Sequence, residues 1–209
     1  MKYVLNVIIV AALFMGGCTK DNFIKSGLSD GRFDGSLLEY MEAPGHSYDW
    51  DSTALMVRRA GEDMVRLFEG KDPAHPEITF FGPTNHSIRR YMLQNKILRV
   101  ADMEPEWCKE ILLRHVFDGK IYRDDVPRGK GGDRGDLGEG GERYTSLGNV
   151  VLWLFTFRET YGNVQEAGAV KLKCMNVKWL NMIEIATTNI EPDNCVVHSL
   201  GYSYTLGEL

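Results

Sequence analysis

The stretch Ile78-Thr79-Phe80-Phe81-Gly82-Pro83-Thr84-Asn85-His86-Ser87-Ile88 joins two kinds of local structure at one corner. Its first part, from Ile78 to Phe81, is rich in β-branched and aromatic residues and predicts a strand. Pro83 has no backbone N–H to donate, so the strand should end before it. Thr84 or Asn85 then offers a side-chain oxygen that can cap the free amides of a helix. The stretch therefore predicts a strand that turns directly into a helix.

Short helices are expected on both sides of this corner. Three precede it: one from Ser36 to Met41, one capped by Asp51-Ser52, and one from Glu62 to Glu69. After the corner, a further helix should begin near Pro105. Residues of that helix recur at helical spacing and predict one buried face, made of Trp107, Cys108, Ile111, Leu112 and His115.

The later part of the chain changes to the patterns of strands. Five are expected, over Arg143 to Ser146, Val150 to Arg158, Ala169 to Asn176, Trp179 to Thr188 and Val196 to Tyr204. Short helices early and strands late predict the α+β class. We expect a single domain over residues 35–209, because 209 residues suffice for one ordinary core.

Between the helices and the strands, residues 128–142 form a Gly-rich segment of mixed charge. The segment brings no apolar surface to bury, which predicts an exposed, mobile loop. It contains Arg134-Gly135-Asp136, the tripeptide that integrins recognise. We interpret this match as chance, because the segment is rich in Arg, Gly and Asp. It lacks the GK[ST] and GxGxxG patterns of loops that cradle phosphates.

The amino terminus has the parts of an export signal. Lys2 supplies positive charge, and Tyr3 to Met15 is almost wholly apolar. A membrane-spanning helix needs about 20 residues, so this run is too short to be one. The run leads into Phe14-Met15-Gly16-Gly17-Cys18, which resembles the lipobox of bacterial lipoproteins, with Met15 where Leu is usual.

The lipobox resemblance implies cleavage before Cys18 and lipid on that cysteine. We expect residues 1–17 to be the signal peptide and residues 18–34 a lipidated tether. Stable anchoring takes two or more acyl chains, and this type of lipidation supplies them. Lys20-Asp21 partly resembles the charged tether that sends Bacteroidetes lipoproteins to the cell exterior.

Charge and cysteine content limit the partners. The net charge is -5, and Lys and Arg form no run beyond pairs such as Arg58-Arg59, so no nucleic acid partner is expected. With Cys18 lipidated, three cysteines remain, and an odd number cannot pair completely within one chain. We expect these three cysteines to be small buried residues, with a disulfide between Cys174 and Cys195 as the alternative.

Three segments, taken in order and spacing, resemble the signature boxes of the fasciclin (FAS1) domain family. The first is the corner from Thr79 to Ile88, the second runs from Ile111 to Gly119, and the third from Asp193 to Leu200. The similarity extends over about Asp34 to Leu209. It implies a β-rich wedge with helices that acts in adhesion or extracellular binding, without catalysis.

The boxes contain five residues that we expect to serve the structure: Pro83, Thr84, Asn85, His115 and His198. Strand alternation sets His198 with Val196 and Leu200 on one face, which we expect to be the core face. A buried imidazole needs a hydrogen-bond partner. The resemblance places that partner near the turn at residues 83–85.

The chain also departs from the family pattern. Cys195 stands where Gly is usual, and the long Gly-rich segment is unusual for the family. Arg114 precedes His115, whereas integrin-binding animal members often carry Tyr-His there. Integrin binding is therefore not carried over to this chain.

No pattern of a catalytic or metal site is present. HExxH and GxSxG do not occur, so neither catalysis nor a cofactor is expected. Asp124-Asp125 is a carboxylate pair that we interpret as a solvated turn. One segment mixes aromatic and acidic residues: His46, Tyr48, Asp49, Trp50 and Asp51. These side chains could stack on a sugar ring and accept hydrogen bonds from its hydroxyls. The favoured interpretation is that the aromatic residues pack over the start of a helix.

The sequence therefore predicts a non-enzymatic cell-surface adhesion or binding protein. It would be held on the outer membrane by lipid on Cys18, facing the exterior, and would bind an unidentified extracellular protein or glycan. The alternative is an accessory glycan-binding lipoprotein of an outer-membrane nutrient-uptake system, in which aromatic residues such as Trp50 contact the sugar. A hydrolase is the least favoured reading, because no catalytic constellation is visible.

Overall fold

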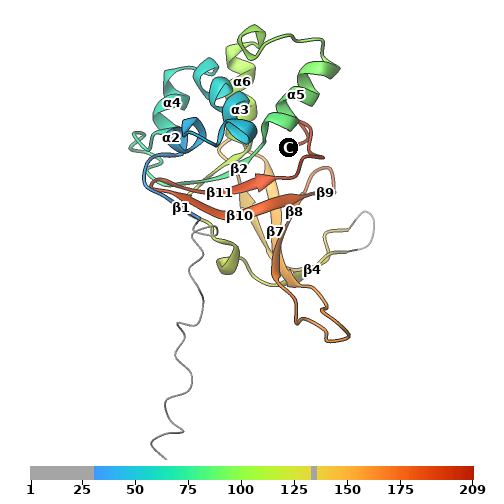
Figure 1. Cartoon of the computed structure of the whole chain (residues 1–209). Coiled ribbons are helices and arrows are strands. Elements are labelled where there is room, and N and C mark those ends of the chain that lie inside the picture. The colour runs from blue at the N-terminus through green and yellow to red at the C-terminus, as the bar shows by residue number, and fades with distance from the viewer. Residues whose placement is uncertain (1–30, 133–135) are drawn as a thin grey trace, which may run out of the picture. The chain divides into compact units, whose positions relative to one another are not determined.

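The computed structural model describes residues 31–132 and 136–209 (Figure 1). The expected lipidation site, Cys18, lies outside these ranges, as do Arg134 and Gly135 of the integrin-like tripeptide. Within the described residues, no helix has the length and apolar character needed to cross a bilayer.

Five α-helices and two short 3₁₀ helices are described. They are α2 (Leu37–Glu42), α3 (Ser47–Arg59), α4 (Glu62–Phe68), α5 (Asn85–Gln94), η1 (Val100–Asp102), α6 (Pro105–Arg114) and η2 (Arg123–Asp125). The helix expected at Ser36 is confirmed, and its start is a capping box. The Glu39 amide donates to Ser36 Oγ at 3.3 Å, and the Ser36 amide donates to Glu39 Oε2 at 2.7 Å.

The predicted start of the second helix at Asp51-Ser52 is wrong. Helix α3 begins about one turn earlier, at Ser47, with His46 as its N-cap. His46 makes no side-chain hydrogen bond to the free amides of the first turn, and histidine is not among the residues preferred at a helix N-cap. Trp50 lies in the extra turn and is buried, so its packing helps to hold the turn helical.

The strands form two main sheets. In the five-stranded sheet the order is β1 (Arg32–Phe33), β10 (Ile185–Pro192), β11 (Cys195–Leu200), β2 (Ile78–Gly82) and β3 (Val116–Asp118). In the antiparallel four-stranded sheet the order is β6 (Glu142–Thr145), β7 (Val151–Arg158), β8 (Val170–Asn176) and β9 (Asn181–Ile183). The central pair of the first sheet, β11 and β2, is parallel, and His198 lies opposite Phe81.

The fold has three layers, with helices, the five-stranded sheet and the four-stranded sheet in turn (Figure 1). One apolar cluster lies on the helix side of the first sheet and includes Phe80 and Val197. A second lies between the two sheets and includes Phe81 and Leu200. Strands β2 and β11 are therefore buried on both faces, which explains their nearly continuous apolar runs. The expected α+β class is confirmed.

One predicted strand is wrong in its extent. The run from Trp179 to Thr188 divides into β9 and β10, which belong to different sheets. The chain crosses from one sheet to the other at Glu184, between Ile183 in the inter-sheet core and Ile185 opposite Leu200. Periodicity cannot detect such a crossing, because both pieces have the character of a strand.

The Gly-rich segment contains a two-stranded ladder where the sequence predicts only a loop. β4 (Gly129–Lys130) pairs antiparallel with β5 (Glu139–Gly140), and Trp153 Nε1 donates to the Gly140 carbonyl at 2.9 Å. Gly140 has φ +70°, and a Cβ there would lie 2.4 Å from the Arg128 carbonyl oxygen. The glycine at this position therefore serves a close turn and not only chain flexibility.

The three described cysteines, Cys108, Cys174 and Cys195, are free and buried. The Cys174–Cys195 pair that the sequence left open is not formed. Cys195 belongs to the helix-side cluster and Cys174 to the inter-sheet cluster, so the two side chains pack on opposite sides of the five-stranded sheet. Burial raises the pKa of both thiols, which makes them inert under ordinary conditions.

Candidate functional site

The residues of the predicted corner lie where β2 meets α5. The strand ends at Gly82, as expected from Pro83, whose carbonyl accepts a hydrogen bond from Thr53 Oγ1 at 2.7 Å. Thr84 is the N-cap residue of α5, but neither it nor Asn85 makes the predicted side-chain cap. Thr84 Oγ1 is buried and has no hydrogen-bond partner among the described residues.

Asn85 instead binds a different helix. Its Oδ1 accepts from the Ser52 amide at 2.7 Å, and its Nδ2 donates to the carbonyls of Ser47 and Tyr48, each at 2.8 Å. The Ser52 amide and the Tyr48 carbonyl are a pair that α-helix geometry joins, and the carboxamide bonds to both members of this pair. Asn85 therefore fixes the start of α3 against the start of α5.

His115 is fully buried behind α6. Its Nδ1 lies 2.8 Å from the Ile111 carbonyl and must carry the proton, and its Nε2 then accepts from the Tyr204 hydroxyl at 2.8 Å. Burial lowers the pKa of His115 to about 4, although the Ile111 carbonyl opposes this shift. The ring is thus neutral and enclosed, and both of its nitrogens are used in hydrogen bonds within the chain.

His198 is fully buried on β11, and its predicted partner is wrong. Its Nε2 lies 2.9 Å from the carbonyl of Ile121, not near the turn at residues 83–85. The parallel register with β2 sets His198 opposite Phe81, before that turn, with the two rings 5.0 Å apart. Burial lowers the pKa of His198 to about 4. Its Nδ1 finds no partner among the described residues.

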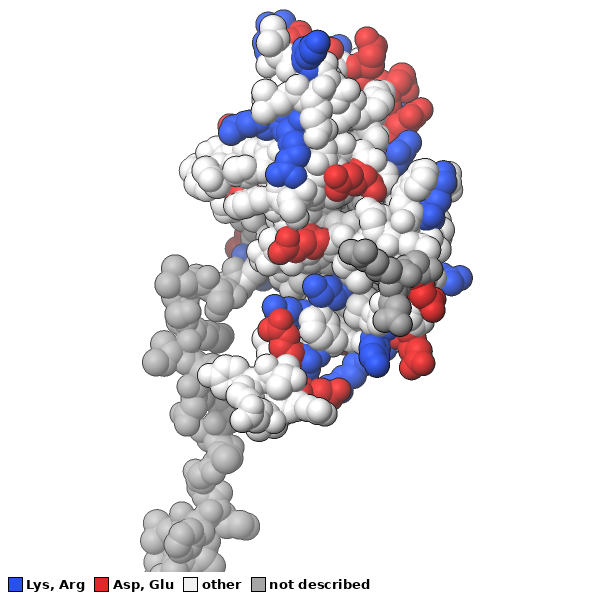
Figure 2. All heavy atoms as spheres, turned by 90° about the vertical axis from the view of Figure 1, so that its right-hand side faces the viewer, with Lys and Arg blue, Asp and Glu red and all other residues white. Residues whose placement is uncertain are grey.

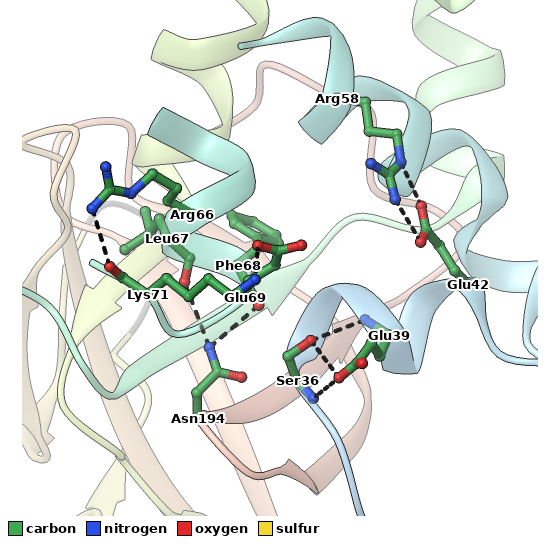
Figure 3. Close-up of polar contacts among 10 residues, drawn as sticks. All are labelled: Ser36, Glu39, Glu42, Arg58, Arg66, Leu67, Phe68, Glu69, Lys71 and Asn194. Carbon is green, nitrogen blue, oxygen red and sulfur yellow. Dashed lines mark hydrogen bonds and ion pairs between the residues drawn. The ribbon is translucent and has the colours of Figure 1, made fainter. Parts of the chain in front are cut away.

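Asn194, in the third box, ties the helices to the sheet. Its Oδ1 accepts from the Leu37 amide at 2.8 Å, and Nδ2 donates to the carbonyls of Phe68 at 3.3 Å and Leu67 at 3.5 Å. Figure 3 shows the amide nitrogen directed at these two carbonyls, at the end of α4. Gly70 packs on the same side chain, since a Cβ there would lie 2.7 Å from Asn194 Cβ. The polar residues of the boxes therefore bind the chain itself, and a ligand site must be sought on the surface.

Three aromatic rings from distant parts of the chain meet on the surface; we call Tyr48, His86 and Tyr202 the ring cluster. The centroids of Tyr48 and His86 are 5.8 Å apart, and those of His86 and Tyr202 are 4.3 Å apart. Tyr48 is 70% exposed and Tyr202 is 48% exposed. The rings come from α3, from α5 and from the segment after β11.

The ring cluster is held by polar contacts around its rim. The Tyr202 hydroxyl donates to Asp49 Oδ1 at 2.9 Å, and this hydrogen bond raises the pKa of Tyr202. The guanidinium of Arg90 donates to the carbonyls of Tyr202, at 2.8 Å, and Ser203. The segment that carries Tyr202 is thereby fixed to α5.

A cavity of 370 Å³ opens beside Tyr48 and His86. Its lining includes the exposed side chains of Asp51 and Arg89, and neither forms an ion pair with any residue that the structure describes. Asn85 lies in the lining too, with its carboxamide already bonded to α3. The face shown in Figure 2 carries both basic and acidic side chains, and the basic ones form no continuous positive surface.

The aromatic and acidic cluster predicted at residues 46–51 is divided by the fold. Trp50 is 3% exposed and packs in the helix-side core, so the suggestion that it contacts a sugar is wrong. His46 lies against Tyr40, with centroids 4.4 Å apart, while Tyr48 turns outward to the ring cluster. Sequence reasoning missed His86 and Tyr202 as its neighbours, because no spacing along the chain connects them.

The other candidate positions carry little chemistry. Asp124 and Asp125 lie exposed on η2, where Asp124 pairs with Arg123 at 2.8 Å, in agreement with a solvated turn. Burial raises the pKa of the Cys108 thiol to about 11. Within residues 31–132 and 136–209, no three His, Cys, Asp or Glu side chains are grouped so that they could hold a metal ion.

Comparisons with known proteins bear on the family. A model of the fasciclin domain matches residues 60–202, a range that includes all three boxes. A solved FAS1 domain pair from the insect cell adhesion molecule fasciclin I is similar, with 10% sequence identity and a TM-score of 0.48. That similarity covers 76% of this chain and 45% of the other, so the chain spans less than half of that protein's length. The comparison with curated proteins gave no match. Because the family model covers more than half of its residues, the chain belongs to the fasciclin domain family.

Proposed function

We propose that this protein is a non-enzymatic, lipid-anchored binding protein of the cell surface, which presents its fasciclin domain to an extracellular partner. The observation that carries the proposal is the ring cluster. Two tyrosines and a histidine, fixed by contacts from three segments, stand partly exposed beside an open cavity. Exposed aromatic side chains that are held in place favour recognition, because little conformational freedom is lost on binding.

The anchor rests on the amino-terminal sequence. A positive start, an apolar run and Gly16-Gly17-Cys18 favour export and lipidation of Cys18. Two or more acyl chains would hold the protein on the outer membrane. Lys20-Asp21 favours an exterior orientation, so that the domain would face possible partners.

The anchor is tested by membrane fractionation and mass spectrometry of the native amino terminus. We expect acylated Cys18 as the first residue, and release of the Cys18→Ala protein from the membrane fraction. Thr19→Ala, beside the cleavage site, is the matched control and should stay attached. Full membrane retention of the Cys18→Ala protein would overturn the lipid anchor. If protease added to intact cells leaves the parent protein undigested, the exterior orientation is wrong.

The binding function is tested with cells that display the full chain. Their attachment is measured on surfaces coated with a glycoprotein, with the same glycoprotein after deglycosylation, and with albumin. Cells displaying the Tyr48→Ala variant should attach less than parent cells, while Tyr161→Ala, which removes an equally exposed tyrosine in the β7–β8 loop, should change nothing. If displaying cells attach no better than cells without the protein, adhesion is not its function.

The second candidate is an accessory lipoprotein of a glycan-uptake system. Exposed Tyr48 favours it, in place of the buried Trp50. Deletion of the gene should then slow growth on a polysaccharide as the sole carbon source and leave attachment unchanged. The adhesion proposal predicts the reverse pair of results.

A further inference from the structure

We propose that the cavity beside the ring cluster binds a neutral pyranose saccharide. The inference rests on the proposed binding function and names the ligand class of the same site. Three features of the site carry it: an exposed tyrosine supported by the ring cluster, a free carboxylate with a free guanidinium, and the balance of charge between these two groups.

The exposed ring of Tyr48 can stack on the apolar face of a sugar. Aromatic faces carry partial negative charge, and the axial C–H groups of a pyranose carry partial positive charge, so the two stack. Tyr48, which is 70% exposed, and His86 both line the cavity. Their ring planes are 62° apart, so the stacking face is that of Tyr48, the more exposed ring. Tyr202 is fixed by Asp49 and Arg90 and packs on His86, which in turn contacts Tyr48. The rings are therefore supported before any ligand arrives.

The cavity also offers groups for sugar hydroxyls. Asp51 is an acceptor with two oxygens, and Arg89 is a donor with several N–H groups. Both side chains are exposed, and no described residue uses them in a hydrogen bond or ion pair. Sugar hydroxyls can donate to the carboxylate and can accept from the guanidinium. The volume of 370 Å³ lies in the range of small-ligand cavities, about 300–1,000 Å³.

The charges favour a neutral sugar. Among the residues that line the cavity, Asp51 is a free carboxylate and Arg89 is a free guanidinium. An anionic sugar would be opposed by Asp51, and an amino sugar with a free ammonium would be opposed by Arg89. A neutral pyranose uses one free charge of each sign without leaving a like charge opposed.

A proline-rich peptide is the main rival, since it also docks on aromatic rings. Proline residues have no N–H, so such a segment offers acceptors to Arg89 but few donors to Asp51. Such a peptide would leave the carboxylate of Asp51 to water, whereas sugar hydroxyls can donate to it. The free carboxylate therefore favours a ligand rich in hydroxyl groups.

The test uses the full chain, solubilised in a detergent without a sugar headgroup. It is applied to immobilised neutral gluco-, manno-, galacto-, xylo- and N-acetylglucosamine oligosaccharides, to oligogalacturonate and to a proline-rich peptide. The dissociation constant for the best neutral probe is then measured by calorimetry. Tyr48→Ala should weaken binding about tenfold or more, and Asp51→Asn and Arg89→Ala each several-fold. Two exposed residues away from the cavity provide matched controls, Tyr161→Ala and Arg143→Ala, which should stay within about twofold of the parent.

The outcomes separate this inference from the proposed function. Binding of a neutral oligosaccharide that depends on Tyr48 supports the inference. Binding of oligogalacturonate or of the peptide alone overturns it, as does saccharide binding that the three variants leave unchanged. If no probe binds while displaying cells still attach to the deglycosylated surface, the sugar assignment is wrong and the adhesion function stands. If attachment is absent as well, both are wrong.

Discussion

Acid should weaken this fold through two histidines, His115 and His198. Both are fully buried, and burial lowers the pKa of each from its ordinary value of 6.5 to about 4. Below pH 6.5 the unfolded chain takes up protons on these rings, while the folded chain does so only near pH 4. The free energy of unfolding should therefore fall as the pH falls from 6.5 to 4, and above 6.5 these groups should have no effect.

The size of the effect follows from the two pKa values. One pH unit corresponds to about 1.4 kcal/mol for a single group. At pH 5, which is about 1.5 units below the unfolded value, each histidine should cost about 2 kcal/mol relative to pH 7.5. If the two act independently, the loss is about 4 kcal/mol. That is a large share of the roughly 5–15 kcal/mol of a typical domain.

The assay is urea unfolding at pH 7.5 and pH 5, followed by circular dichroism. The free energy of unfolding is measured at both pH values for the parent, for His115→Gln and for His198→Gln. The quantity compared among the three proteins is the loss of this free energy between pH 7.5 and pH 5. Each variant should lose about 2 kcal/mol less than the parent on acidification. Tyr161→Ala, a surface change, should retain the whole loss. An equal loss in the parent and both histidine variants would refute the reasoning.

Three further predictions concern stability and reactivity. Asn85→Ala removes three hydrogen bonds to the first turn of α3 and should lower the free energy of unfolding in urea by about 2–4 kcal/mol; a change under about 0.5 kcal/mol would contradict this role. Gly70→Ala should cost more than Gly45→Ala in the same assay. Both glycines have a positive φ, but only a Cβ at Gly70 would clash with a neighbour, the side chain of Asn194. Equal losses in the free energy of unfolding for the two variants would show that Asn194 moves aside at no cost. The three described cysteines should react with a thiol reagent slowly in the native state and fully in urea, and rapid native labelling would show that they are accessible.

The features that the sequence determined by itself are local or rest on patterns of side-chain type. The capping box of α2 needs only Ser36 and Glu39, which lie within one turn. The end of β2 needs only Pro83, which has no N–H. The order of apolar patterns was enough for the α+β class, and the three boxes together were enough for the fasciclin family.

The tertiary structure decided which side chains meet. The start of α3 depends on Asn85, the partner of His198 is the carbonyl of Ile121, and neither contact leaves a trace in spacing. Burial is also a property of the whole fold: Trp50 and Tyr48 are two residues apart, yet one packs in the core and the other joins the ring cluster. Hydrogen bonds and exposure depend on distances in space between segments that are far apart along the chain. The ring cluster, built from α3, α5 and the segment after β11, therefore exists only once those segments are folded together.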